Sequence, residues 1–187
     1  METFALDDES SLLYGKVTGC PVDFDELWDL HPPTFNKIKM FDRYVPVPRY
    51  QLFYLRDYCF SGVVHKAEPL HDGFKPFLEF VNSLGMGAFN GILVNFYENG
   101  KHCVGAHRDN ERDLIPNSPV VTVSLGQTRT FRLRSYDTKR VVLDLPLEDG
   151  TYCAMTGLTN QRYTHEIVKG TEPDRRISIT FRQFKEM

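Results

Sequence analysis

The sequence predicts an α+β protein of one domain, in which one or two short helices precede a β-sandwich or open barrel. Three observations support this fold class. The length of 187 residues suits a single domain. Hydrophobic residues make up 41% and charged residues 25%, which is typical of a globular chain. Two segments with helical signals are followed by several short segments with strand patterns.

Composition also excludes several classes of protein. No run of about 18 apolar residues occurs, so no membrane-spanning helix is predicted and no membrane partner is expected. The N-terminus is acidic and lacks an apolar core, so it does not resemble a signal peptide. The four cysteines are scattered, which indicates a reduced protein inside the cell, in the nucleus or the cytoplasm. We expect it to act as a monomer.

Charge is divided unevenly along the chain. Residues 1–34 carry eight acidic side chains and one basic side chain, whereas the rest of the chain carries 21 basic and 17 acidic ones. We therefore expect an acidic N-terminal extension at 1–34, partly disordered or packed beside the core, and one domain at 35–187. A mildly basic domain is compatible with a polyanionic partner, and equally with an ordinary solvated surface.

Two segments have helical signals. Asp23 is an N-cap candidate followed by acidic residues, which predicts a short helix over 23–30. Residues 76–85 begin with proline, end with glycine and place apolar side chains at helical spacing, which predicts a second helix.

Later segments have strand patterns. Alternation or β-branched side chains predict strands at 91–97, 120–125, 130–134, 142–147 and 176–182. Asp149 and Gly150 mark a turn between strands. About eight short strands are expected in all.

The sharpest sign of function is a possible metal site. His107 and Asp109 are two residues apart, so on an extended segment their side chains point to the same side. His165, just ahead of the last strand, is the natural candidate for a third ligand. Two histidines and one carboxylate form the facial triad of non-haem Fe(II) oxygenases, and zinc hydrolases can also use such a set.

The last predicted strand has two different faces. Arg176, Ser178, Thr180 and Arg182 share one face, and three apolar side chains share the other. If the apolar face joins the core, the polar face directs two arginines into the sandwich, where each requires an anionic partner. Arginine binds carboxylates through two parallel hydrogen bonds, so a small dicarboxylate would suit the pair. The alternative is an outward-facing, charged edge strand.

In combination, these residues resemble the AlkB family of Fe(II)- and 2-oxoglutarate-dependent dioxygenases. The likeness covers roughly residues 35–184, and its main matches are His107-x-Asp109, His165, Arg176-x5-Arg182 and the strand Asn95-x-Tyr97. Segments 40–49 and 60–62 are similar to the nucleotide-recognition lid of the eukaryotic duplex-DNA repair branch.

The resemblance implies a double-stranded β-helix (jelly-roll) core with N-terminal helices and a lid. It implies Fe(II) on His107, Asp109 and His165. It also implies 2-oxoglutarate bound by Asn95, Tyr97, Arg176, Ser178, Thr180 and Arg182, with Arg176 at the distal carboxylate and Arg182 near the C1 carboxylate. With O2, the implied reaction is oxidative demethylation of a DNA base such as 1-methyladenine or 3-methylcytosine, giving succinate, CO2 and formaldehyde, as in DNA alkylation repair.

The resemblance further implies residues that meet the substrate. A methyl group on the Watson–Crick edge is inaccessible within a duplex, so the base must be flipped out or already single-stranded. Phe60, with Tyr58, matches aromatic side chains that stack on a flipped base, opposite the His107 ring. Glu111 matches an acid that could read the base edge, and Phe41 matches an apolar wedge that fills the vacated stack. The alternative for the three aromatic residues is an ordinary place in the core.

Basic residues could add contacts with nucleic acid. Arg49 could contact a phosphate or the pocket. Strand alternation places Arg132 and Arg134 on one face, within the densest basic run of the chain, a candidate phosphate track formed by Arg129, Arg132, Arg134, Lys139 and Arg140. A solvated hairpin is the alternative.

The sequence leaves four hypotheses for function. The first is a DNA demethylase. The second is an RNA demethylase of the same family, because the basic cluster that the duplex-repair branch carries after His165 is missing here. The third is a non-catalytic reader of modified bases, against which the complete triad argues. The fourth is another barrel metalloenzyme, such as a cupin-type isomerase or a zinc hydrolase, which would have no use for the Arg176 and Arg182 pair.

Overall fold

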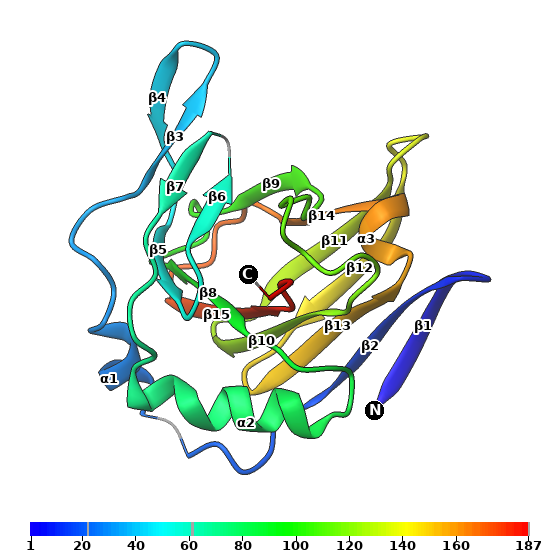
Figure 1. The fold of residues 1–187 in the computed structure, drawn as a ribbon, viewed down its shortest axis with the longest axis horizontal. Coiled ribbons are helices and arrows are strands. Elements are labelled where there is room, and N and C mark those ends of the chain that lie inside the picture. Colours follow the sequence, from blue (N-terminus) through cyan, green and yellow to red (C-terminus); the bar gives the residue numbers. More distant parts are fainter. Residues whose placement is uncertain (22, 61, 187) are drawn as a thin grey trace.

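The computed structural model describes residues 1–187 except 22, 61 and 187, and does not describe the side chains of Met40 and Phe60. Two facing antiparallel sheets form its core (Figure 1). The larger sheet has the spatial order β1 (Glu2–Asp7), β2 (Ser10–Lys16), β13 (Thr151–Gly157), β10 (Val120–Gly126), β15 (Arg176–Arg182), β8 (Gly91–Tyr97) and β5 (Tyr50–Tyr54). The smaller sheet has the order β12 (Val141–Leu147), β11 (Arg129–Ser135), β14 (Tyr163–Ile167) and β9 (Val104–His107). This arrangement is the predicted double-stranded β-helix.

Two hairpins and a few short helices surround the sandwich. The hairpins are β3 (Lys37–Met40) with β4 (Arg43–Pro46), and β6 (Tyr58–Phe60) with β7 (Val63–His65), and both lie at one end of the sandwich (Figure 1). The helices α1 (Phe24–Trp28), η1 (Asp72–Phe74) and α2 (Lys75–Ser83) pack on the outer face of the larger sheet. The helix α3 (Thr159–Arg162) connects β13 to β14.

Both predicted helices are confirmed, with shorter bounds. Asp23 caps α1, because its Oδ1 accepts hydrogen bonds from the backbone N–H groups of Asp25 (2.9 Å) and Glu26 (3.2 Å). Pro76 lies in the first turn of α2, and Gly85 follows its end with a φ of +70°, which glycine adopts without strain. None of the helices among the described residues is long and apolar enough to cross a membrane.

The five predicted strands are confirmed as β8, β10, β11, β12 and β15. The described part of the chain also contains strands that no sequence pattern singled out. The strand β13 is buried on both faces over most of its length, so it lacks the alternation of a half-exposed strand. The hairpin strands have only three or four residues, too few to show a period.

Much of the acidic segment 1–34 lies within the larger sheet. The strand β2 pairs with β13 over its whole length, and Leu12 of β2 is fully buried between the two sheets. On the opposite face of the sheet, Leu27 and Trp28 of α1 join the core that α2 covers. This segment was expected to be an extension, but it contributes two strands and a helix to the packed structure.

The strand β15 lies inside the larger sheet, between β10 and β8, and all of its side chains are buried. Ile177, Ile179 and Phe181 join the core beneath the helices, as predicted. The polar face of the strand points into the space between the sheets, where Ser178 and Thr180 line a cavity. The alternative of a charged edge strand is therefore wrong.

We expect Leu12→Ala to lower the free energy of unfolding by about 2–4 kcal/mol, because it removes a fully buried side chain that anchors β2. Urea denaturation followed by circular dichroism would measure this loss. Val142→Ala on β12 is the control, since Val142 is 45% exposed and its truncation should cost less than about 1 kcal/mol. Equal losses for the two variants would show that β2 does not stabilise the sheet.

Candidate active site

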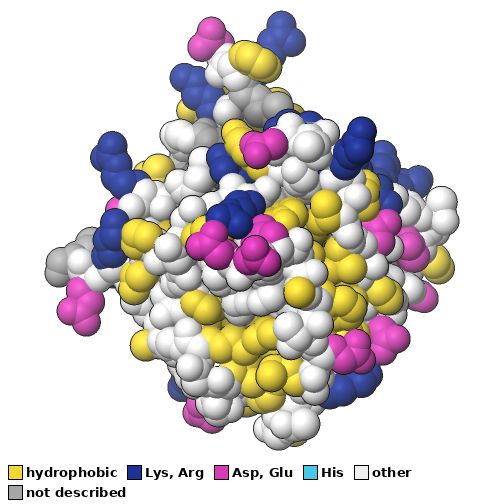
Figure 2. Space-filling view, turned by 90° about the vertical axis from the view of Figure 1, so that its right-hand side faces the viewer, with side chains coloured by type: hydrophobic (Ala, Val, Ile, Leu, Met, Phe, Trp, Pro, Cys, Tyr) yellow, Lys and Arg dark blue, Asp and Glu magenta, His cyan; other side chains and the backbone are white. Residues whose placement is uncertain are grey.

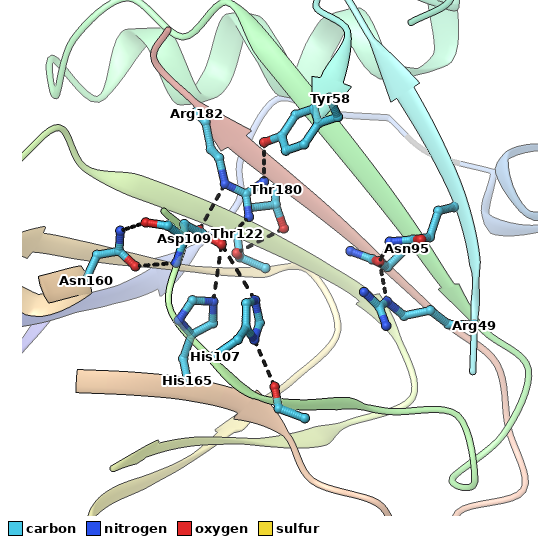
Figure 3. A network of polar contacts seen from close by, with 12 residues as sticks. Arg49, Tyr58, Asn95, His107, Asp109, Thr122, Asn160, His165, Thr180 and Arg182 are labelled. Carbon is cyan, nitrogen blue, oxygen red and sulfur yellow. Dashed lines mark hydrogen bonds and ion pairs between the residues drawn. The ribbon is translucent and has the colours of Figure 1, made fainter. Parts of the chain in front are cut away.

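The three predicted metal ligands lie together between the sheets. His107 ends β9, Asp109 follows it in the next loop, and His165 lies on β14, where it is the register partner of His107. Asp109 Oδ1 lies 3.6 Å from His107 Nε2 and 3.9 Å from His165 Nε2 (Figure 3). One potential ligand atom from each residue lies within 4.8 Å of the others, so the set can hold one metal ion.

Both histidines can offer an unprotonated nitrogen to a metal. Nδ1 of His107 lies 2.9 Å from the carbonyl oxygen of Gly105. Because a carbonyl only accepts hydrogen bonds, Nδ1 carries the proton and the Nε2 lone pair is available. Burial, with the neighbouring His107, lowers the pKa of His165 to about 3, so its ring is neutral at physiological pH.

The carboxylate of Asp109 is held in its charged form by Arg182. Nε of Arg182 donates to Oδ2 at 2.9 Å, and Nη2 lies 2.8 Å from Oδ1. Burial alone would raise the pKa of Asp109, but Arg182 and the two histidines lower it well below the usual value. Nη1 of Arg182 donates to the hydroxyl of Tyr58 (2.5 Å). The structure therefore places Arg182 primarily against the metal ligand, between the triad and the cavity.

Asn160 of α3 holds the backbone of Asp109 from two sides (Figure 3). Its Oδ1 accepts from the Asp109 N–H at 2.9 Å, and its Nδ2 donates to the Asp109 carbonyl at 2.7 Å. These bonds fix the metal-binding loop just beyond the end of β9. Sequence reasoning gave Asn160 no role, although its position five residues before His165 was a usable signal.

A small inner cavity lies beside the triad, between the sheets. Five of the six predicted cosubstrate residues line it: Asn95, Tyr97, Ser178, Thr180 and Arg182. They come from the neighbouring strands β8 and β15, whose register pairs Ser178 with Asn95. The sixth residue, Arg176, is the register partner of Tyr97.

Arg176 has the chemistry of a carboxylate-binding residue. Its side chain is completely buried, and no carboxylate among the described residues forms an ion pair with it. Nη2 donates to Ser124 Oγ at 2.8 Å, and the guanidinium lies 5.0 Å from the centre of the Tyr97 ring. Nε and Nη1 have no hydrogen-bond partner in the described structure. A buried guanidinium with free N–H groups requires an acceptor, so Arg176 fits a carboxylate such as that of 2-oxoglutarate.

A larger, open cleft lies on the other side of the triad. It is bordered by the two hairpins and by the loop that follows β9, and it shares His107, Arg49 and Arg182 with the inner cavity. Glu111 also lines this cleft, and its Oε2 is buried without a hydrogen-bond partner. Burial raises the pKa of Glu111, and Arg182 opposes that effect. The triad thus separates a small polar cavity from a wide cleft.

Arg49 belongs to this site rather than to the outer surface. Its side chain is buried, and it lines both the inner cavity and the outer cleft. Nε donates to Asn95 Oδ1 at 2.6 Å, and Nη1 donates to the carbonyl of Cys103 at 3.4 Å. Of the two places that the sequence left open for Arg49, the structure brings it to the pocket.

The three aromatic candidates have different surroundings. Tyr58 is buried between Phe53 and Phe184 in the wall of the cleft, with its hydroxyl bound to Arg182. Phe41 is 94% exposed at the turn between β3 and β4, which excludes an ordinary core position. The side chain of Phe60 lies outside the described structure, so its predicted stacking role is not tested here.

The predicted phosphate track does not form a continuous basic surface. Arg129 is buried and donates to four backbone carbonyls, so a phosphate contact for Arg129 is wrong. Arg132 forms two 2.6 Å hydrogen bonds with Asp144, and Arg134 bonds to Glu166 at 2.7 Å. Alternation along β11 places both on the sheet face opposite Phe131 and Leu133, away from the triad. The structure does not bring them into the site.

Comparison with known proteins agrees with this geometry. A profile of the 2OG-Fe(II) oxygenase superfamily matches residues 50–182. These features define a dioxygenase whose cofactors are Fe(II) and 2-oxoglutarate, with O2 as the second cosubstrate. The DNA oxidative demethylase ALKBH2 of Homo sapiens is 31% identical over 192 residues, which cover 95% of this chain and 73% of that protein. The chain therefore belongs to the AlkB family of this superfamily.

Two further likenesses are weaker, one because it is shorter and the other because its sequence identity is lower. The alpha-ketoglutarate-dependent dioxygenase alkB homolog 3 of Rattus norvegicus is 33% identical over 103 residues, which cover 50% of this chain and 35% of that protein. Among solved structures, OsALKBH1 has a TM-score of 0.63 and 15% identity, covering 92% of this chain and 97% of the other. That structural likeness supports the fold alone.

Asn160→Ala should weaken metal binding about tenfold, because the loop that carries Asp109 loses both of its side-chain clamps. Isothermal titration calorimetry with Mn(II) would measure the affinity. Asn110→Ala is the matched control, since Asn110 is exposed on the same loop and makes no hydrogen bond to the described residues. Identical Mn(II) affinities for the two variants would mean that the clamp is dispensable.

Arg176→Met should weaken 2-oxoglutarate binding by about 10–100-fold, because the buried carboxylate loses its charged donors. Equilibrium dialysis with labelled 2-oxoglutarate and Mn(II) would report the change. Arg132→Met removes an arginine that is already paired with Asp144, so its affinity should equal that of the unmodified protein. Tight binding by Arg176→Met would place the carboxylate elsewhere.

Proposed function

We propose that this protein is an oxidative demethylase of N-alkylated bases in DNA, such as 1-methyladenine and 3-methylcytosine, and that it acts in DNA alkylation repair. The observation that carries the proposal is the position of the triad between two spaces of different character. The inner cavity is lined by Tyr97, the register partner of Arg176, whose Nε and Nη1 have no partner in the described structure, and the outer cleft is wide and bordered by exposed hairpins. A relative with 31% identity is named a DNA oxidative demethylase, which supports this choice of substrate.

The chain would hold its cofactors with the residues described above. His107, Asp109 and His165 would bind Fe(II), and Arg176 would bind one carboxylate of 2-oxoglutarate. When bound, iron and 2-oxoglutarate supply, with O2, the oxidation of an N-methyl C–H bond that no acid or base in a protein can achieve, releasing succinate, CO2 and formaldehyde. Arg182 favours the ionised form of Asp109, which is the form that would bind a metal.

The outer cleft would receive the methylated base. A base that carries a methyl group on its Watson–Crick edge must leave the stack before that group can approach His107 and the metal. Glu111 lines the same cleft with one carboxyl oxygen that has no partner among the described residues. That oxygen could accept a hydrogen bond from the exocyclic amino group that adenine and cytosine share.

The projecting β3–β4 hairpin has the features of a nucleic-acid contact. Phe41 at its turn is 94% exposed, and an apolar side chain in that position can fill the space of a flipped base. Lys37, Lys39 and Arg43 of the hairpin are exposed and form no ion pair within the described structure. On the face seen in Figure 2, most Lys and Arg side chains lie in the upper half, toward the hairpins. Such charges would bind phosphates.

The setting of the activity is also proposed. The four cysteines are all free, which supports a reducing compartment inside the cell, in the nucleus or the cytoplasm. We propose that the protein acts on DNA as a monomer. Arg132 and Arg134 remain candidates for contacts with the DNA backbone only outside the cleft, because both are paired with carboxylates.

Incubation with Fe(II), ascorbate, O2 and 2-oxoglutarate should remove one methyl mass from oligonucleotides that contain 1-methyladenine or 3-methylcytosine. Mass spectrometry would compare single-stranded DNA, duplex DNA and RNA of the same sequence. We expect the two DNA substrates to react faster than RNA. The His107→Ala variant should be inactive on all three, because it lacks one metal ligand.

The outcomes separate the possible substrates. If RNA reacts faster than DNA, the substrate is RNA and the proposed chemistry is unchanged. If succinate is released without loss of methyl mass, the protein is still a dioxygenase, but these bases are not its substrates. Phe41→Ala should slow the reaction on duplex DNA at least several-fold more than on single-stranded DNA, because only the duplex leaves a gap in its stack.

A further inference from the structure

Three buried polar side chains form a hydrogen-bonded row between the inner cavity and the outer cleft. Arg49 Nε donates to Asn95 Oδ1 at 2.6 Å, a contact visible in Figure 3, and Gln51 Nε2 donates to the same oxygen at 3.1 Å. The exposed fractions are 9% for Arg49, 5% for Asn95 and 2% for Gln51. Gln51 lies on β5, directly opposite Asn95 of β8 in the register of the larger sheet.

The chemistry of these groups fixes the direction of every bond in the row. A guanidinium can only donate hydrogen bonds, so Asn95 must present its oxygen to Arg49. Gln51 meets the same oxygen and must therefore present its amino group. With two donors on Oδ1, rotation of the Asn95 amide by half a turn would place its N–H groups against two other donors.

One consequence is that the amino group of Asn95 is available to a ligand. Its Nδ2 makes no hydrogen bond to the described residues, and Asn95 lines the inner cavity. Gln51, in contrast, lines the outer cleft, so it contacts Asn95 from the side away from the inner cavity. We propose that Gln51 is a positioning residue for 2-oxoglutarate: together with Arg49, it holds the Asn95 amide so that Nδ2 donates to an oxygen of the cosubstrate. This inference rests on the dioxygenase part of the proposed function and not on the choice of base.

The side chain of Gln51 does not favour the stability of the folded state, and this is a second argument that it positions Asn95. Its Oε1 is buried and has no hydrogen-bond partner in the described structure. A buried acceptor without a donor destabilises the folded state, whereas an apolar side chain of similar size would avoid that cost. A polar side chain in this position is therefore explained by what its amino group does for Asn95, and not by packing.

Two substitutions test the proposal. In Gln51→Glu, the ionised carboxylate can only accept, so it competes with Arg49 for the orientation of the Asn95 amide and draws Nδ2 toward residue 51, away from the cosubstrate. We expect the Kd for 2-oxoglutarate, measured by calorimetry with Mn(II), to rise at least tenfold. In Gln51→Met, Arg49 alone orients Asn95, so the Kd should rise about threefold, while the melting temperature stays unchanged or increases.

A matched control separates positioning from the burial of a charge. Gln183 is 7% exposed, donates to the Met86 carbonyl and lines neither cavity, so Gln183→Glu should lower the melting temperature and leave the Kd for 2-oxoglutarate unchanged. If Gln51→Glu binds 2-oxoglutarate as tightly as Gln183→Glu does, the proposal is wrong. If Gln51→Glu does not fold, Gln51→Met decides: weaker binding with an undiminished melting temperature supports the proposal, and unchanged binding overturns it. No oligonucleotide is present, so failure of the DNA assay would not affect this result.

Discussion

The ion pair between Asp109 and Arg182 is the interaction on which the rest of the site depends. A carboxylate as deeply buried as Asp109 would be protonated without a partner, and a protonated carboxyl group is a poor metal ligand. Arg182 comes from β15 of the larger sheet, whereas both histidines belong to the smaller sheet. The charge of the metal site is thus maintained across the sandwich, and loss of Arg182 would leave an unpaired charge in the interior.

The ion pair between Asp109 and Arg182 also gives the two arginines of β15 different roles. Arg182 is neutralised by Asp109, so Arg176 is the arginine of β15 that is left for the cosubstrate. A dicarboxylate in the inner cavity would therefore be oriented by its surroundings, with one carboxylate at Arg176 and the other near the triad. Across the triad, Glu111 gives the outer cleft a buried carboxyl oxygen that has no partner among the described residues.

Sequence reasoning was sufficient where the signal is local or periodic. The spacing of His107 and Asp109, and the alternation along β15, placed the triad and the polar face of the cavity correctly. It failed where a role depends on a distant partner. Arg129 belongs to a basic run in the sequence, yet it is buried among carbonyl groups of other segments. The strand β2 is recognisable only through its pairing with β13, some 140 residues later, and β1 only through its pairing with β2.

The place of β15 has a consequence for how the protein is made. This strand follows all the other described strands in the sequence, yet it lies between β10 and β8 inside the larger sheet. During synthesis the gap between β10 and β8 stays open, with unpaired backbone groups, until residues 176–182 have left the ribosome, and such long-range closure is intrinsically slow. A chain interrupted before residue 176 would lack both arginines of the site together with the strand that completes the sheet, so truncated products would be exposed to aggregation and degradation while lacking the cosubstrate site.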